Sequence, residues 1–200
     1  MNVPANIEPL KQLFHRYEEE TTLLPPELDE FMHAVFKERK YRKKDLLLHA
    51  DDVPQNSWFI VKGSARAYFY DPDAGREITC WFWYEGEWIL SLKGLFKQEE
   101  TNESIELLQD CTLLMISASD LKKMVRLFPE YRLFERCLIE DYQSRMSDHF
   151  HDLKSMANRH KFNKLMETHK EIFNLAYIRD IASFLDMHPA TLSRMRRGEE

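Results

Sequence analysis

Between residues 41 and 117 the chain is a succession of short runs rich in β-branched and aromatic residues, separated by turn residues. The clearest turn is "DPDAG" at 71–75, where Pro72 presets φ and Gly75 supplies the positive φ that closes a hairpin. "WFIVKGSARAYFY" precedes it, "REITCWFWY" follows it, and "IELLQDCTLLMIS" comes after a mixed loop. Five or more such runs with tight turns predict an all-β roll, jelly roll or barrel.

The residues before this β-rich region are predicted to form two helices. In 7–20, "IEPLKQLFHRYEEE", apolar residues recur at helical spacing, which indicates a short amphipathic helix. The stretch 23–41, "LLPPELDEFMHAVFKERKY", is predicted as a second helix, because Pro25 and Pro26 stand at its start, where a missing N–H is harmless.

After residue 118 the pattern becomes helical again. Ser119 is predicted to cap a helix that Pro129 interrupts, and a long helix is predicted from about Tyr131 to Met156. Its apolar residues near heptad spacing are Leu138, Tyr142, His149, Leu153 and Met156, with Met146 and Phe150 one position off that stripe. We favour a twofold seam against a second copy; the alternative is packing on the chain's own β-region alone.

Composition places the chain among globular proteins. Its 200 residues are 44% apolar and 31% charged, enough for one substantial core or two modest domains. No apolar run approaches the roughly 18 residues of a membrane span, and the N-terminus lacks signal-peptide features, so we expect a cytoplasmic protein with no membrane partner. Cys80, Cys111 and Cys137 are odd in number and widely spaced, which favours reduced, buried thiols over a disulfide framework.

Charge is distributed unevenly along the chain. The formal net charge is −6, but from Lys154 to Glu200 there are nine Lys/Arg and six Asp/Glu residues, so the preceding residues carry −9. The total charge therefore does not exclude nucleic acid; it predicts that only one face of the molecule binds it.

The C-terminal stretch "YIRDIASFLDMHPATLSRMRR" is predicted as helix, tight turn and helix. Asp186 in the turn tolerates the left-handed conformation, His188 falls at the cap of the second helix, and Pro189 at its first position. Ala182 supplies the small side chain that two crossing helices need. This is the spacing of a DNA-binding helix-turn-helix, although a plain helical hairpin with a basic, solvated end is the alternative.

In such a motif the exposed residues of the second helix meet the DNA. We expect Arg194 to read guanine, because its guanidinium can bond both O6 and N7. We expect phosphate contacts from other polar residues of this helix. The predicted DNA-binding set is His188, Pro189, Ala190, Thr191, Ser193, Arg194, Arg196 and Arg197.

A β-region, a long helix and a terminal helix-turn-helix together resemble the Crp/Fnr family of bacterial transcription regulators. The resemblance rests on "WFIVKGSARAYFYDPDAGREITCWFWYEGEW", "GLFKQEETNESIELLQDCTLLMIS" and "IASFLDMHPATLSRMRR", the last being close to Bacteroidetes-type members. It implies an α+β fold in three parts: N-terminal helices and a cyclic-nucleotide-binding-type β-roll (1–118), a long dimerisation helix (119–157) and a helix-turn-helix domain (158–200).

The resemblance also places a candidate effector pocket in the roll. Cyclic-AMP-binding members have a Gly-Glu pair and, further on, an Arg-Ser pair that binds the cyclic phosphate. Gly86 and Glu87 match the first pair and Ser104 matches the serine, but Glu103 stands at the arginine position. A carboxylate there repels a phosphate, so we expect no useful affinity for cyclic AMP or cyclic GMP. Trp88, with Trp81 and Trp83, lines an apolar effector pocket or simply belongs to the core.

The resemblance implies a homodimer that binds double-stranded DNA and responds to an unknown small-molecule effector, with RNA polymerase as a further partner. Members continue past the recognition helix into a β-hairpin wing; here the sequence given stops at Glu200, so we expect no full wing. The N-terminal cysteine cluster of the family's iron–sulfur sensors is not found in the sequence, and we expect no cofactor of that type.

Two other classes of function remain as alternatives. An enzyme or metal protein is disfavoured: His49 is the only histidine between 41 and 117, and His149 and His151 point to different sides of a helix. No nucleophile–base pair or phosphate loop is visible, so we expect no catalytic residues and no metal site. The second alternative is a ligand-binding or protein-interaction roll that has lost DNA binding.

Overall fold

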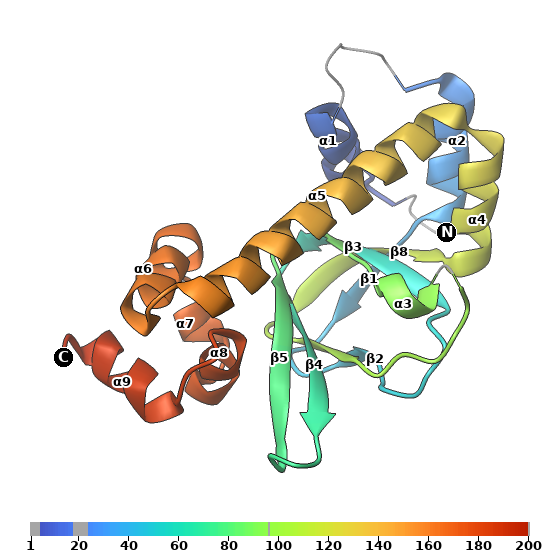
Figure 1. The fold of residues 1–200 in the computed structure, drawn as a ribbon. Helices are drawn as coiled ribbons and strands as arrows, with labels where there is room; N and C mark the ends of the chain where they lie inside the picture. The colour runs from blue at the N-terminus through green and yellow to red at the C-terminus, as the bar shows by residue number, and fades with distance from the viewer. Residues whose placement is uncertain (1–4, 18–23, 96, 200) are drawn as a thin grey trace.

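The computed structural model describes residues 5–17, 24–95 and 97–199, and within them eight strands form two four-stranded antiparallel sheets (Figure 1). The first sheet has the order β1-β8-β3-β6 and the second β2-β7-β4-β5. The strands are β1 Lys37–Tyr41, β2 Leu46–Leu48, β3 Asn56–Lys62, β4 Ala65–Asp71, β5 Arg76–Trp83, β6 Trp88–Ile89, β7 Ser104–Leu107 and β8 Cys111–Ser117. The predicted β-roll is confirmed.

The predicted hairpin joins β4 and β5. Asp71 pairs with Arg76 at its end, the Asp71 carboxylate accepts bonds from the N–H groups of Asp73 and Ala74, and Gly75 has φ +63°. A second tight turn, between β3 and β4, requires glycine for another reason. At Gly63 φ is +122°, and a Cβ there would lie 2.2 Å from the Cys111 sulfur.

The helices before the roll are α1 (Glu8–Tyr17) and α2 (Pro26–Val35). The prediction that the second helix extends to residue 41 was wrong, because Lys37–Tyr41 forms strand β1, paired with β8. This strand, "KERKY", is almost entirely exposed, so it shows no alternation of apolar and polar residues. Its charged side chains are typical of the edge of a sheet.

Two helices follow the roll, α4 (Ala118–Leu127) and the long α5 (Pro129–Ser155), as the position of Pro129 predicted; a short helix, α3 (Leu92–Leu95), lies within the roll. The cap of α4 is Ser117 and not Ser119, because the Ser117 hydroxyl accepts the bond from the Asp120 N–H. In Figure 1, α5 crosses the roll and connects α1, α2 and α4 at one end with the C-terminal helices at the other.

The apolar stripe predicted along α5 faces the protein's own interior over much of its length. Leu138 and Tyr142 are buried, the first against the N-terminal helices and the second against Trp81 of the roll. The ring of His149 stacks on Phe184. The large apolar side chains that α5 leaves exposed are Leu133, Met146 and Phe150, beside Met156 at its C-cap.

The C-terminal helices form a small lobe, here called the helical lobe: α6 (Asn158–His169), α7 (Ile172–Leu175), α8 (Ile178–Phe184) and α9 (Pro189–Arg197). Phe162, Leu165, Ile181 and Leu192 are buried in its core. Two residues of the roll, Phe82 and Leu108, are buried in the same core. The division at residue 157 thus falls between two helices, while the apolar packing continues across it.

Candidate nucleic-acid interface and effector region

The predicted helix-turn-helix consists of α8, a turn over residues 185–188 and α9. Asp186 adopts φ +49° in the turn, and the Met187 N–H donates to the Ala182 carbonyl at 2.9 Å. His188 caps α9, because its Nδ1 accepts a bond from the Ala190 N–H at 3.2 Å, and Pro189 is the first helical residue. The positions of Asp186 in the turn, His188 at the cap and Pro189 at the start of α9 were predicted from the sequence and are confirmed.

Packing fixes the angle between the two helices. Ile181 and Ala182 of α8 and Leu192 of α9 are fully buried, and Ala182 brings no bulk to the crossing. At its far end α9 closes on Gly198, whose φ of +76° directs the Glu199 N–H to the Arg194 carbonyl. The exposed face of α9 is therefore presented by a helix that is held at both ends.

The predicted DNA-binding residues lie on different parts of α9. Ala190, Arg194 and Arg197 are exposed at helical spacing on one face, with half-buried Ser193 beside them and exposed His188 at the start. Arg197 is held by Glu199 in a two-pronged pair at 2.7 and 2.8 Å. Pro189 and Thr191 are half-buried.

Arg196 lies away from this face. Its guanidinium donates to the Asn174 side chain at 3.4 Å and lies over the Phe173 ring, both on α7. Arg194 and Arg196 are two residues apart, which on a helix directs them to different sides. The basic cluster seen in the sequence is thus divided between two surfaces.

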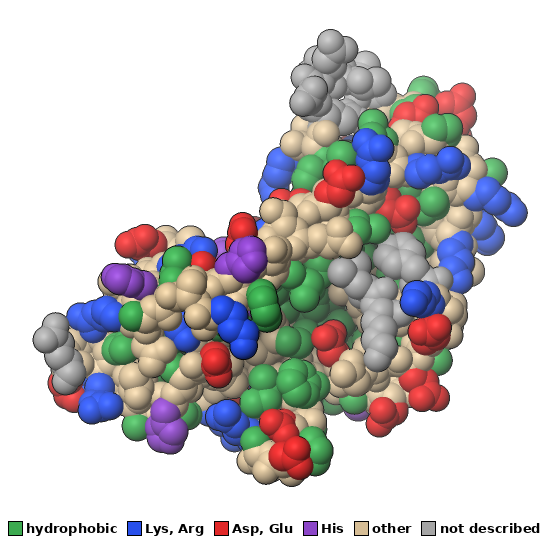
Figure 2. Space-filling model, in the orientation of Figure 1, with side chains coloured by type: hydrophobic (Ala, Val, Ile, Leu, Met, Phe, Trp, Pro, Cys, Tyr) green, Lys and Arg blue, Asp and Glu red, His purple; other side chains and the backbone are tan. Residues whose placement is uncertain are grey.

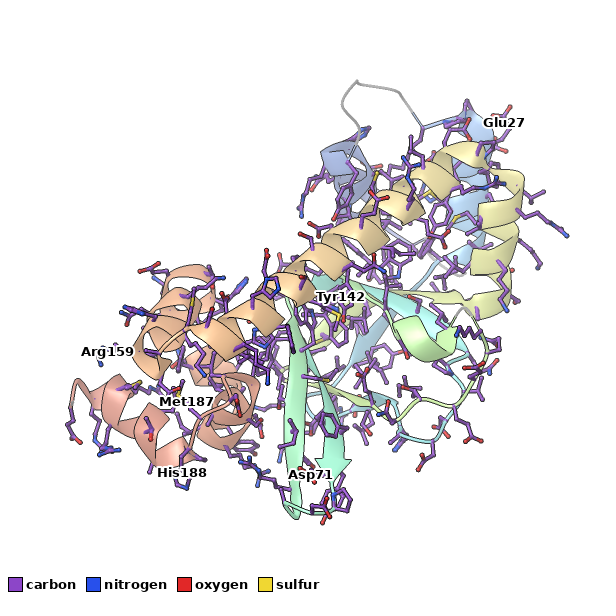
Figure 3. The ribbon with its side chains drawn as sticks, in the orientation of Figure 1. Glu27, Asp71, Tyr142, Arg159, Met187 and His188 are labelled. Carbon is purple, nitrogen blue, oxygen red and sulfur yellow. The ribbon has the colours of Figure 1, made fainter. Side chains whose placement is uncertain are left out.

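Arg159, at the start of α6, is a candidate that the sequence did not indicate. It shares a surface hollow with Thr191, Arg194 and Met195 of α9, and Figure 3 labels it on the helical lobe together with His188. On the face shown in Figure 2, Lys, Arg and His side chains are spread over this lobe, and hydrophobic side chains gather between the lobe and the roll.

The helical lobe is attached to the roll by a buried ion-pair cluster. Arg66 of β4 is only 3% exposed and contacts the carboxylates of Glu77 at 2.7 Å, Glu106 at 2.8 Å and Asp180 of α8 at 3.1 Å. A second link joins Ser183 to β5, because the Ser183 hydroxyl accepts a bond from the Thr79 N–H at 3.1 Å. Burial raises the pKa of Asp180, while Arg66 lowers it.

The residues of the predicted effector pocket separate into two groups. Glu87, after Gly86 with φ +81°, pairs with Arg145 of α5 at 2.7 Å. Trp88 is buried in the N-terminal core, where its indole N–H donates to Ser57. It therefore belongs to the core and not to a ligand pocket.

Glu103 and Ser104 form the second group. The Cys80 thiol contacts Glu103 at 3.7 Å, and Ser104 accepts a bond from the Ala50 N–H at 3.0 Å. Tyr142 connects the two groups: burial raises the pKa of its phenol, and the charges of Glu103 and Glu87 raise it further. The charges of Glu87 and Glu103 thus act on the same phenol, although Glu87 is itself paired with Arg145.

No group of three or more His, Cys, Asp or Glu side chains suited to a metal occurs among the described residues. No helix in the described part of the chain is long and apolar enough to cross a membrane. The three cysteines are free; Cys111 is buried and Cys80 and Cys137 are half-buried.

Comparison with known proteins supports this geometry. Residues 38–127 match the model of the cyclic nucleotide-binding domain. No curated protein sequence matches the chain significantly.

Solved structures extend the similarity over most of the chain. FixK2 from Bradyrhizobium japonicum is 20% identical, with a TM-score of 0.68 over 82% of this chain and 84% of that one. CLP from Xanthomonas campestris, described as a c-di-GMP-responsive global regulator, is 14% identical, with a TM-score of 0.67 over 87% and 91%. A Crp/Fnr-family transcriptional regulator from Eubacterium rectale is 19% identical, with a TM-score of 0.69 over 91% and 86%.

The roll thus has the fold of a cyclic nucleotide-binding domain and matches that family's model over residues 38–127. The complete arrangement of roll, long helix and helix-turn-helix lobe is the architecture of the Crp/Fnr regulators.

Proposed function

We propose that this protein is a homodimeric, sequence-specific DNA-binding transcription regulator that responds to an effector other than cyclic AMP or cyclic GMP. The observation that carries the proposal is the exposed face of α9, which His188 and Gly198 hold at its two ends on a Crp/Fnr-type scaffold. Arg194 would read a base edge in the major groove, and Arg197 and Arg159 would contact phosphates. Two such heads in a dimer would recognise half-sites about one helical turn apart.

The proposed dimer seam lies along α5. Ile139, Met146 and Leu153 follow one another at seven-residue intervals, and Phe150 lies one turn beyond Met146. Met146 is 43% and Phe150 57% exposed, although both are apolar. A second copy of α5 packed in parallel would cover this face, while Leu138 and Tyr142 stay packed inside each chain.

Regulation would act through the position of the helical lobes. An effector that favours one arrangement of roll, α5 and lobe shifts the population toward the DNA-binding separation of the two α9 helices. The carboxylate of Glu103, which stands at the position of the phosphate-binding arginine, argues against cyclic AMP or cyclic GMP in that role.

Calorimetric titration with cyclic AMP and cyclic GMP tests this last point directly. We expect no saturable heat at millimolar nucleotide, because Glu103 would face the phosphate. Micromolar binding of either nucleotide would contradict the assignment.

The alternative is a roll that has lost DNA binding and serves as a ligand or protein-interaction module. Selection from random duplex DNA at near-physiological salt separates the two functions. The wild-type protein is compared with Arg194→Ala and with Arg136→Ala, which removes an exposed arginine from α5 far from α9.

We expect a two-part, roughly palindromic site for the wild-type protein and for Arg136→Ala. Arg194→Ala should relax the preference at one base of each half-site, at a cost of about 1–3 kcal/mol. Enrichment that is the same in all three proteins would remove Arg194 as the base reader. No enrichment in any of them, with the chain folded and dimeric, would favour the module.

A further inference from the structure

A cavity of about 310 Å³ lies where the roll, α5 and the helical lobe meet. Its wall includes Trp81 of β5, Tyr84 after it, His149 of α5, Lys161 and Leu165 of α6, and Phe184 of α8. The volume is at the lower end of the range of about 300–1,000 Å³ that is typical of small-molecule sites. Gly86, Glu87, Glu103 and Ser104 are not part of this wall, although Arg145, which pairs with Glu87, is.

Flat rings line the cavity in fixed orientations. The rings of His149 and Phe184 stack with centroids 4.1 Å apart and planes within 11°, and Trp81 meets His149 edge-on. Tyr84 and His169 stack at 3.8 Å and 5°. Rings that are already packed against one another lose little freedom when another ring is placed on them, so the wall suits a planar aromatic group.

The cavity wall also contains a buried cation. Lys161 is 5% exposed, and its ammonium has one long bond, 3.4 Å to the Asp186 carbonyl. No carboxylate among the described residues lies within salt-bridge distance of it. An ammonium has three donors, and its burial is unfavourable unless an anion compensates it. Lys164, on the same wall, is half-exposed and already paired with Asp152 at 2.5 Å.

We infer that this cavity binds a small organic anion with a planar aromatic ring, its carboxylate on the Lys161 ammonium and its ring against Phe184 and His149. The ligand would contact the roll, α5 and the lobe at once. It would therefore fix the lobe, with its α9, relative to the roll. As a means of regulating DNA binding, this role of the ligand rests on the proposed function.

The test uses 1-naphthoate as the probe and neutral 1-naphthamide as its matched control, each titrated by calorimetry in the absence of DNA. We expect saturable binding of the naphthoate, at least tenfold tighter than that of the amide. Lys161→Met should reduce naphthoate affinity at least tenfold and leave the amide unchanged. Lys170→Met removes the same charge from the exposed end of α6, outside the cavity wall, and should change neither affinity.

Thr168→Trp is a second variant that tests the cavity, and it leaves the buried core unchanged. Thr168 is exposed and lines the cavity, so a large side chain there should block both probes while the circular dichroism spectrum stays native. Equal affinities for the two probes, absence of saturable binding, or naphthoate binding that survives Thr168→Trp would overturn the inference. Because no DNA is present, these results are independent of the DNA selection, and either proposal can fail alone.

Discussion

At the scale of single residues, the burial of His149 makes stability depend on pH. Desolvation lowers the pKa of His149 below its ordinary value of 6.5. The nearby charges oppose one another, since Asp152 raises the pKa of this imidazole while Lys164 and Lys161 lower it. The unfolded chain therefore binds a proton near pH 6.5 that the folded protein resists.

The sign of the effect follows from that difference. Neutral His149 contributes fully to the free energy of unfolding at pH values above its pKa in the unfolded chain. This contribution is lost as the pH falls below about 6.5. We expect the urea midpoint to decrease between pH 7.5 and 5.5, and to decrease less in His149→Phe, which keeps a ring on Phe184. Other titrating groups are common to both proteins. An identical pH dependence of the two midpoints would contradict the assignment.

At the scale of secondary structure elements, the hydrogen bond between Ser183 of α8 and the Thr79 N–H of β5 tests how the lobe is attached. Thr79 is 2% exposed, so Ser183→Ala leaves a buried donor without its acceptor, at a cost of about 1–3 kcal/mol. We expect faster amide exchange at Thr79 and a lower urea midpoint. Ser193→Ala, on α9, should change neither, and unchanged exchange at Thr79 would show that water replaces the serine.

The elements that sequence patterns predicted are those with a local signal. The hairpin at 71–75, the break at Pro129 and the cap at His188 each depend on residues within one turn of chain. Strand β1 was missed because "KERKY" is polar throughout and is specified by its partner β8. The sequence indicated the capped helix with Arg194 but not Arg159, which meets α9 only through the path of α6.

The contacts between segments distant in sequence could not be predicted. Arg66 and Asp180 are far apart in the chain, and nothing in either local sequence indicates the partner. The same holds for Trp88, whose burial with the N-terminal helices depends on how α1 and α5 pack. The stripe on α5 was correct in its period, but the residues on it divide between the interior and the surface, which spacing alone does not distinguish.

At the scale of the whole molecule, the exposed apolar face of α5 predicts the oligomeric state. Phe150 is 57% exposed in the single chain, and a glutamate there would place two charges at the proposed twofold seam. We expect wild-type protein to sediment at twice the chain mass of 24.0 kDa and Phe150→Glu at the chain mass.

Leu127→Glu is the matched control for this experiment. Leu127 is 53% exposed but lies at the end of α4, so this variant should sediment like the wild type. Dimers of equal stability in all three proteins would place the seam elsewhere on the surface.

The presence of Phe82 and Leu108 in the core of the helical lobe has a consequence for protein engineering. Regulators of this architecture look modular, as though a reading head could be cut from one sensor and fused to another. Here a graft that begins at Asn158 would lose two side chains of its own interior and expose the surface they cover. A transplantable head from this protein would have to carry a substitute for that edge of the roll, so its recognition and sensing parts cannot be exchanged independently.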